Sequence, residues 1–194
     1  KKDIIEIIKQ SNGIVVIDEA YYEYAKDSPD YPDSMLYRYD NIITLRTFSK
    51  AHGLAGFRVG YGFAHEELIK NLLKVKLPFE PSILAQEAAI AALDDEDFIQ
   101  DSLKINSNQK NDLYQFFKEN HIKYIDSKTN FITIIFDDEK TNHNICEDLL
   151  KEGVIVRNLI GFGLPNCMRV TIGLENENHI FKQAFLKVIK KVVQ

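Results

Sequence analysis

Short apolar runs alternate with stretches of helical spacing along the first 120 residues. The runs at 14–17 and 42–45 are rich in β-branched residues and predict strands buried on both faces of a parallel sheet. Residues 59–64 predict a third strand, in which Gly60 and Gly62 permit another group to approach closely. Apolar residues recur at intervals of three and four in the stretches that predict helices: 3–9, 65–76, 82–93 and 97–120.

The remainder of the chain contains a second alternation of strands and helices. The predicted strands are 131–136, 154–157 and 168–172, and the predicted helices are 142–152 and 177–193. This order of elements predicts an α/β fold. We expect a boundary between two parts within or just after the long helix, and we place it after residue 95, which gives the parts 1–95 and 96–194.

Few strands precede the long helix. Only three apolar runs are found there, whereas a parallel sheet needs more strands, with helices on both of its faces. We therefore expect the 194 residues to be the later part of a longer protein.

Composition and charge exclude several classes of protein. Hydrophobic residues make up 45% of the 194 residues and aromatic residues 11%, which suits a folded core and not a disordered or fibrous chain. A formal net charge of -5 without a basic run disfavours nucleic-acid binding. No apolar stretch reaches the roughly 18 residues of a membrane helix, and the first residues do not form a signal segment, so we expect a cytoplasmic protein.

Cysteine and histidine spacing predicts neither a disulfide framework nor a metal site. Cys146 and Cys167 are far apart, without a CxxC pair or a histidine at ligand spacing, so reduced thiols are expected. The histidines fall in loops or at predicted helix ends, and no metal role is expected of them. His52, near Lys50, is expected to pack within its loop.

Polar residues follow the first two predicted strands. Asp18 ends the first strand at the edge where open α/β sheets bind ligands, although alone it is more often a helix cap or half of an ion pair. Thr47 and Ser49 offer hydroxyls after the second strand, and Arg58 can make a bidentate contact to a phosphate. Lys50 lies between them in a segment with few charges, where an amine can lose its proton and become a nucleophile. Each residue alone is more often an exposed side chain, but together they indicate a functional site, which is not a Walker loop.

These strand ends resemble a known family. The stretches that carry the resemblance are IDEAY at 17–21, LRTFSK at 45–50 and GLAGFRVGY at 53–61. They are similar to the pyridoxal-phosphate-dependent aminotransferases of fold type I, and most similar to the histidinol-phosphate aminotransferases among them. The resemblance covers essentially the whole chain. It implies part of a large-domain sheet in residues 1–95, and an interdomain helix with a small C-terminal α/β domain in residues 96–194.

The resemblance implies roles in binding pyridoxal 5'-phosphate. Lys50 would hold the cofactor as a Schiff base and, once freed, move a proton on the substrate. Asp18 would face the pyridine nitrogen and keep it protonated, so that the ring serves as an electron sink. Tyr21 would donate to the phenolic oxygen of the cofactor. The residues that would hold the cofactor phosphate are Thr47, Ser49 and Arg58.

Three later residues are implied to contact the substrate. Arg157 and Arg169 lie at the ends of predicted strands, and Asn130 precedes one. In the family, arginines at these positions grip anionic groups, and a guanidinium pair suits both the phosphate of histidinol phosphate and the carboxylates of glutamate. Alone, each of the three is more often a strand-end or turn residue.

The resemblance predicts a reaction and leaves alternatives open. The predicted reaction is transamination of histidinol phosphate with 2-oxoglutarate in histidine biosynthesis, by a homodimer. One alternative is an aminotransferase of the same fold for another amino acid, such as an aromatic one, and another is a phosphothreonine decarboxylase. A further alternative is an inert structural or oligomerisation module. Because the first half of the family's pocket lies outside these residues, we expect the isolated chain to retain the cofactor weakly and to turn over little.

Overall fold

A computed structural model describes residues 2–192 of the chain. Contacts within the chain divide it into two compact units, Lys1–Leu103 and Lys104–Gln194, so that the division falls inside the long helix α5 (Glu96–Glu119). The assignment of residues 1–95 to a cofactor-binding domain and of 96–194 to a small domain stays a prediction.

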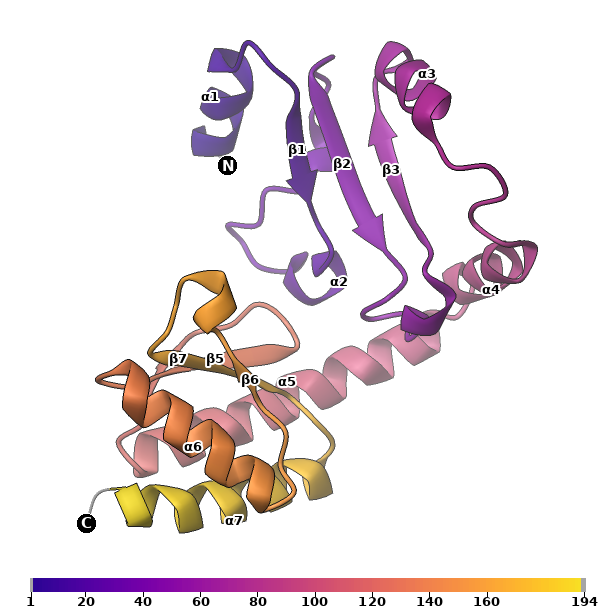
Figure 1. The fold of residues 1–194 in the computed structure, drawn as a ribbon. Helices are drawn as coiled ribbons and strands as arrows, with labels where there is room; N and C mark the ends of the chain where they lie inside the picture. Colours follow the sequence, from indigo (N-terminus) through magenta and orange to yellow (C-terminus); the bar gives the residue numbers. More distant parts are fainter. Residues whose placement is uncertain (1, 193–194) are drawn as a thin grey trace. The chain divides into compact units, whose positions relative to one another are not determined.

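The first unit is built on a three-stranded sheet. β1 (Val15–Asp18) pairs in parallel with β2 (Ile42–Thr47), and β2 pairs antiparallel with β3 (Gly60–Ala64). β1 and β2 therefore end at the same edge of the sheet, beside the short helix α2 (Tyr22–Ala25) (Figure 1). Because Asp18 lies opposite Leu45, the segments that follow the two strands begin at neighbouring positions.

Helices and short turns complete the first unit. Their packing centres on Phe48 and Val59, against which Ala85 and Ala89 of α4 (Ile83–Leu93) are buried. The hydroxyl of Ser82 begins α4 by accepting a hydrogen bond from the Ala85 N–H at 3.2 Å. The elements of this unit besides α2 and the start of α5 are α1 (Lys2–Gln10), η1 (Ser34–Leu36), η2 (Ala55–Phe57), α3 (Glu66–Val75) and α4 (Ile83–Leu93).

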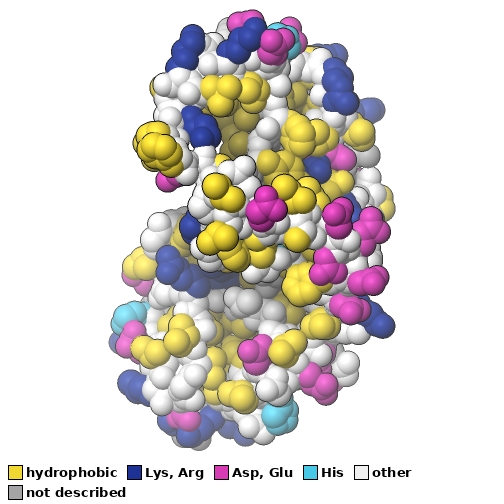
Figure 2. Space-filling model, turned by 90° about the vertical axis from the view of Figure 1, so that its right-hand side faces the viewer, with side chains coloured by type: hydrophobic (Ala, Val, Ile, Leu, Met, Phe, Trp, Pro, Cys, Tyr) yellow, Lys and Arg dark blue, Asp and Glu magenta, His cyan; other side chains and the backbone are white. Residues whose placement is uncertain are grey.

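The expectation that both of the first strands are buried on both faces is wrong for β1. Val16 is 55% exposed, whereas Ile42 and Ile43 of β2 are buried. β2 has a strand on each side, whereas β1 is an edge strand and, among residues 2–192, has no strand on its second side. Apolar side chains of α3 and α4 also reach the surface, among them Val75 and Ile83. These helices lie on the right of Figure 1, and Figure 2 shows the molecule from that side.

The second unit is a four-stranded antiparallel sheet packed against helices. Its strands lie in the order β4 (Lys123–Ile125), β5 (Phe131–Ile135), β7 (Cys167–Thr171) and β6 (Arg157–Asn158). The remaining elements are the later part of α5, α6 (Glu139–Lys151), η3 (Ile160–Phe162) and α7 (Glu175–Val192).

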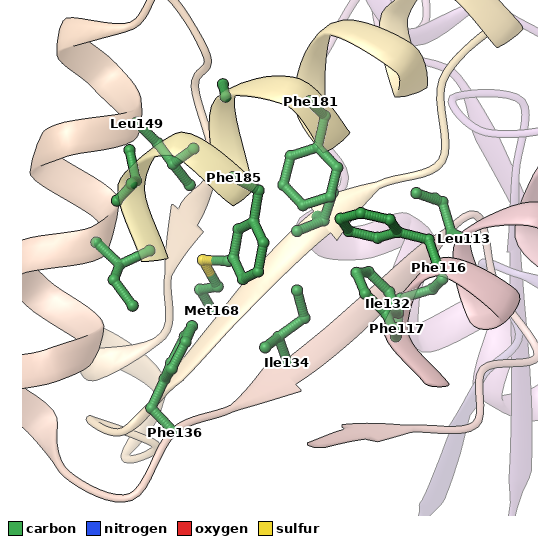
Figure 3. Close-up of a cluster of buried hydrophobic side chains, with 14 of the residues drawn as sticks. Leu113, Phe116, Phe117, Ile132, Ile134, Phe136, Leu149, Met168, Phe181 and Phe185 are labelled. Atoms are coloured by element: carbon green, nitrogen blue, oxygen red, sulfur yellow. The ribbon is translucent and has the colours of Figure 1, made fainter. Parts of the chain in front are cut away.

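Aromatic side chains from α5 and α7 form the core of the second unit with alternate residues of the sheet. Phe117 and Phe185 are fully buried, as are Ile134 and Met168 on the facing strands (Figure 3). The rings of Phe181 and Phe185 lie with centroids 5.4 Å apart. Burial of side chains of this size stabilises a fold by about 1.5–3 kcal/mol each. The cluster therefore fixes β5 and β7 as a rigid support.

The strand predicted at 154–157 is largely wrong. Only Arg157 and Asn158 pair with β7. The N–H of Val154 instead donates to the Leu149 carbonyl at 2.9 Å, so the preceding residues complete the end of α6 before pairing begins. Strand β4 was not predicted, because three residues are too few to show an alternation.

Candidate active site

Lys50 lies in a tight turn directly after β2. The Ser49 N–H donates to the hydroxyl of Thr47 at 3.1 Å, and the Gly53 N–H donates to the Lys50 carbonyl at 3.0 Å. Gly53 has a φ of +71°, a left-handed conformation that glycine adopts without strain. The Lys50 side chain is half-buried, and its Nζ lies 5.3 Å from the centre of the Tyr21 ring. The structure therefore brings together the predicted cofactor lysine and the predicted phenol.

Arg58 contacts one of the two hydroxyls of the same turn. Its Nη1 donates to the Ala55 carbonyl at 2.9 Å and to the Ser49 hydroxyl at 3.4 Å. The guanidinium is exposed, and within residues 2–192 it forms no ion pair with a carboxylate. A guanidinium with a free charge beside the hydroxyls of Ser49 and Thr47 suits an anion such as a phosphate.

Asp18 is exposed at the same edge of the sheet. It is the last residue of β1, and its Oδ1 accepts a hydrogen bond from the Ala20 N–H at 3.0 Å. Tyr21 follows at the start of α2, where its ring also lies near that of Tyr24, with centroids 6.3 Å apart. The first unit thus presents a carboxylate, a phenol, an amine and an anion-binding set at the ends of β1 and β2.

A buried ionic network beneath these residues was missed by sequence reasoning. Glu19 is 4% exposed, and its Oε2 lies 2.9 Å from Nη2 of Arg46. Arg46 Nη2 also contacts Oδ1 of Asp33 at 2.9 Å, and the guanidinium lies 3.4 Å from the centre of the Tyr22 ring. A charged residue within β2, directly after the predicted run 42–45, was the available signal, because such a charge must find a partner when buried.

The carboxylate of Glu19 favours the charged form of Arg46. Burial alone would lower the pKa of Arg46, but its hydrogen bond to Glu19 and the charge of Glu19 outweigh burial and raise it. Burial and the same carboxylate raise the pKa of the Tyr31 phenol. The network thus holds Glu19, the residue after Asp18, to Arg46 of β2, the strand that precedes Lys50.

His52 takes part in a second buried pair. Its Nε2 lies 3.5 Å from Oε1 of Glu23 in α2, and each side chain is 9% exposed. The imidazole also packs on Phe48, with ring centroids 4.9 Å apart. His52 thus packs within its loop, as expected, and in addition faces a carboxylate of another segment.

The close approach predicted at Gly60 is confirmed, and the approaching group is the neighbouring strand. Gly60 lies opposite Thr47 in the ladder between β2 and β3. A Cβ atom at Gly60 would stand 2.8 Å from the carbonyl oxygen of Arg46. This glycine therefore belongs to the support of the Lys50 turn.

Arg157 and Arg169 meet in the second unit. They lie directly opposite each other on β6 and β7, so their side chains share one face of the sheet. Arg169 stands over the Phe131 ring at 4.8 Å and Arg157 lies 5.7 Å from that of Phe162. Neither forms an ion pair within the described part of the chain. Like charges placed opposite each other repel, and an anion between them relieves that repulsion.

Helix α5 holds the loop that presents Asn130 and Phe131. Lys110 Nζ donates to the Ser127 carbonyl at 3.1 Å, and the Ser127 N–H donates to the Tyr114 hydroxyl at 2.6 Å. Asn130 in turn accepts a hydrogen bond from the Ile172 N–H at 2.9 Å through its carbonyl. Asn130 is therefore positioned next to the strand pair that carries the two arginines, within the second unit.

Other candidate chemistry is sparse. Both cysteines are free thiols, and burial raises the pKa of Cys146 to about 11. The described residues contain no group of three or more His, Cys, Asp or Glu residues placed to hold a metal ion. No helix in the part of the chain that the structure describes has the length and apolar character needed to cross a membrane.

Comparison with known families identifies relatives along nearly the whole chain. The model of the family "Aminotransferase class I and II" matches residues 2–181. The histidinol-phosphate aminotransferase of Sulfurovum sp. is 44% identical over 195 residues, which cover 97% of this chain and 53% of that protein. That of Campylobacter jejuni is 44% identical over 191 residues, covering 95% of this chain and 52% of the relative. The chain spans about half the length of the curated relatives it matches.

Solved structures agree with these relatives. The histidinol-phosphate aminotransferase from Sinorhizobium meliloti, in complex with pyridoxal-5'-phosphate, superposes with a TM-score of 0.83 at 28% identity, covering 92% of this chain and 49% of that one. An aspartate aminotransferase from Thermotoga maritima superposes with a TM-score of 0.85 at 19% identity, covering 96% of this chain and 50% of that one. The latter likeness shows the fold, which is the α/β fold of fold type I predicted from the sequence.

Proposed function

The chain belongs to the class I and II aminotransferases, and from that membership we propose that it carries the lysine-bearing part of a pyridoxal 5'-phosphate site for transamination. The proposed amino donor is histidinol phosphate and the acceptor is 2-oxoglutarate, as the names of the relatives support. The observation that carries the proposal is the half-buried Lys50 amine, which lies against Tyr21 beside the anion-binding set of Thr47, Ser49 and Arg58.

The donor set of the first unit fits the chemical groups of this cofactor. The phosphate suits Arg58 and the two hydroxyls, and the ring nitrogen, when protonated, suits the exposed carboxylate of Asp18. Tyr21 offers a hydroxyl for the phenolic oxygen, and Lys50 offers the amine that holds the aldehyde carbon. When bound, the cofactor supplies an electron sink for the carbanion that forms at the substrate.

Lys50 is also the group that would move the proton. Transamination removes a proton from the carbon that bears the amine, so a base must stand within reach of it. The half-buried Nζ and the adjacent Tyr21 ring limit the water around this amine. The ionic network of Glu19 and Arg46 holds the two segments in place while the proton moves.

The second unit supplies the proposed substrate contacts. Arg157 and Arg169 form a cationic pair that suits the phosphate of the donor and a carboxylate of the acceptor, because both anions accept two parallel hydrogen bonds. Asn130 is proposed to line the same site. The homodimer and the cytoplasmic location stay predictions.

A hybrid protein tests this proposal. Residues 1–194 would replace the matching later part of the Campylobacter jejuni relative, so that the first half of the fold is present. We expect the hybrid to form glutamate from histidinol phosphate and 2-oxoglutarate. Arg169→Ala is expected to raise KM for histidinol phosphate roughly 10- to 100-fold, the cost of one hydrogen-bonded charge contact. The control Arg38→Ala, in the first unit, is expected to leave KM unchanged.

Three other outcomes contradict the proposal. Carbon dioxide released from phosphothreonine, without transamination of histidinol phosphate, identifies a decarboxylase. Transamination of aromatic amino acids alone identifies a different donor. A folded hybrid that binds cofactor but turns over none of these substrates supports a structural module.

A further inference from the structure

Two buried acid–base pairs bracket the contact between Tyr21 and Lys50. One segment runs from the end of β1 into α2 and carries Glu19 before Tyr21 and Glu23 after it. The other segment leaves β2 and carries Arg46 before Lys50 and His52 after it. Glu19 pairs with Arg46 at 2.9 Å and Glu23 pairs with His52 at 3.5 Å. The contact at 5.3 Å between Lys50 Nζ and the Tyr21 ring lies between the two pairs along both segments.

The two pairs are not equivalent. Arg46 lies within β2, where the ladders to β1 and β3 already fix its backbone. His52 lies in the turn beyond the strand, and Glu23 lies in α2, a helix of four residues. A single helical turn does not hold itself together in water, so its place depends on tertiary contacts. The Glu23–His52 pair therefore ties the turn beyond β2 to α2, whereas the contacts of Arg46 act from the strand itself.

Burial makes the Glu23–His52 contact important for the orientation of the His52 ring. Both side chains are 9% exposed, and removing one partner leaves the other buried without its contact, which is costly. Phe48 closes one side of the imidazole at 4.9 Å, and the Nδ1 atom is buried without a hydrogen-bond partner in the described part of the chain. Among the described residues, the polar partner of the His52 ring is therefore the carboxylate of Glu23, and this contact fixes the orientation of the ring.

We propose that His52 is a positioning residue, which acts through Glu23 to hold the Lys50 amine against the Tyr21 ring. This inference rests on the proposed function for the role of Lys50, but the pair itself is a property of the first unit. Loss of the pair would let the Lys50 turn and α2 move independently. The amine would then spend more time away from the ring and in water.

Competitive acetylation of lysines measures the exposure of this amine without cofactor or substrate. The 194-residue chain is treated with trace acetic anhydride at fixed pH, and peptide mass spectrometry compares Lys50 with the exposed Lys70 and Lys187. His52→Leu, which removes the polar contact with Glu23, is expected to raise the relative rate at Lys50 about fivefold, the factor given by losing one modest contact. His52→Gln, which can donate, is expected to restore the original rate.

Two further variants separate positioning from general loosening. Glu23→Leu removes the other partner and is expected to raise the rate at Lys50 as His52→Leu does. In a Tyr21→Ala background, His52→Leu is expected to add nothing, because the contact it protects is already absent. The matched control is His65→Ala, which breaks an exposed histidine–carboxylate pair (His65 Nε2 to Asp40 Oδ1, 3.9 Å) in the same unit and is expected to leave Lys50 unchanged.

Several results would overturn the inference. One is an acetylation rate at Lys50 that is unchanged in His52→Leu, or equal in His52→Gln and His52→Leu. Another is additivity of the Tyr21→Ala and His52→Leu effects. A rise in the acetylation rate at all lysines together would mark a purely structural role. The proposed function fails differently, by the absence of a cofactor adduct at Lys50 in the hybrid protein. If the chain shows the acetylation pattern and the hybrid forms no adduct, the positioning role is kept and the aminotransferase role is lost.

Discussion

Lys50 is placed by neighbours that lie far from it in the sequence. The motif stretches predicted Lys50, Tyr21 and Arg58 as members of one site. The structure places Lys50 Nζ 5.3 Å from the Tyr21 ring and Arg58 Nη1 3.4 Å from the hydroxyl of Ser49, the residue before Lys50. The partners of Glu19 and His52 could not be predicted in this way. Arg46 is separated from Glu19 by 27 positions, and spacing carries no information about which buried charges meet across two strands.

Gly60 shows how one missing side chain supports the site. Replacing it by alanine would force a Cβ atom to 2.8 Å from the backbone oxygen of Arg46, on the strand that leads to Lys50. We expect Gly60→Ala to lower the free energy of unfolding of the first unit by about 1–3 kcal/mol, the usual cost of overpacking. Urea denaturation followed by circular dichroism measures this.

The control for that change is Gly56→Ala, because a Cβ atom there meets nothing within 4 Å. It is expected to change the free energy of unfolding little. Equal free energies of unfolding of the two variants would contradict this prediction, because they would mean that the β2 backbone shifts at Arg46 without loss of stability.

Long elements followed the periodicity of the sequence, and short ones did not. The helices α4, α5 and α7 were predicted within a few residues, because each has several turns over which apolar positions repeat. α2 has four residues and β4 has three, so neither is long enough for its period to repeat. Helix α6 begins at Glu139, earlier than predicted, because Asp138 caps it.

The cap of α6 predicts a pH dependence. Asp138 Oδ1 accepts a hydrogen bond from the Thr141 N–H at 2.8 Å, and that bond, followed by the bond from the Thr141 hydroxyl, lowers the pKa of Asp138. A lowered pKa in the folded state means stability that is present above the unfolded pKa of about 3.9 and lost as the pH falls through the folded value.

Asp138→Asn is therefore expected to lose less stability than the original chain between about pH 5 and pH 2, and Asp138→Ala to be less stable at neutral pH. Thermal unfolding at a series of pH values measures both. Asp137→Asn is the control, since that side chain is 85% exposed and does not cap the helix. The same pH slope in Asp138→Asn as in the original chain would contradict this account.

At the scale of the whole molecule, the α/β class was predicted correctly. The open edge of the first sheet is consistent with a chain that is shorter than its relatives. β1 has a sheet partner on one side only, and the chain spans about half the length of the curated relatives it matches. The pattern of apolar runs predicted buried strands, but it could not show whether the residues that bury them lie within this chain. The central claim must therefore be tested where the remainder of the relatives' fold is also present.

The most direct test is the site at which pyridoxal phosphate attaches to the hybrid protein described above. After addition of the cofactor and reduction with borohydride, peptide mass spectrometry locates the adduct, and the visible absorbance is recorded before reduction. We predict an adduct on Lys50, with the absorbance band lost in Lys50→Ala and retained in Lys76→Ala. An unchanged band in Lys50→Ala, or adducts spread over other lysines with none at Lys50, would contradict the account.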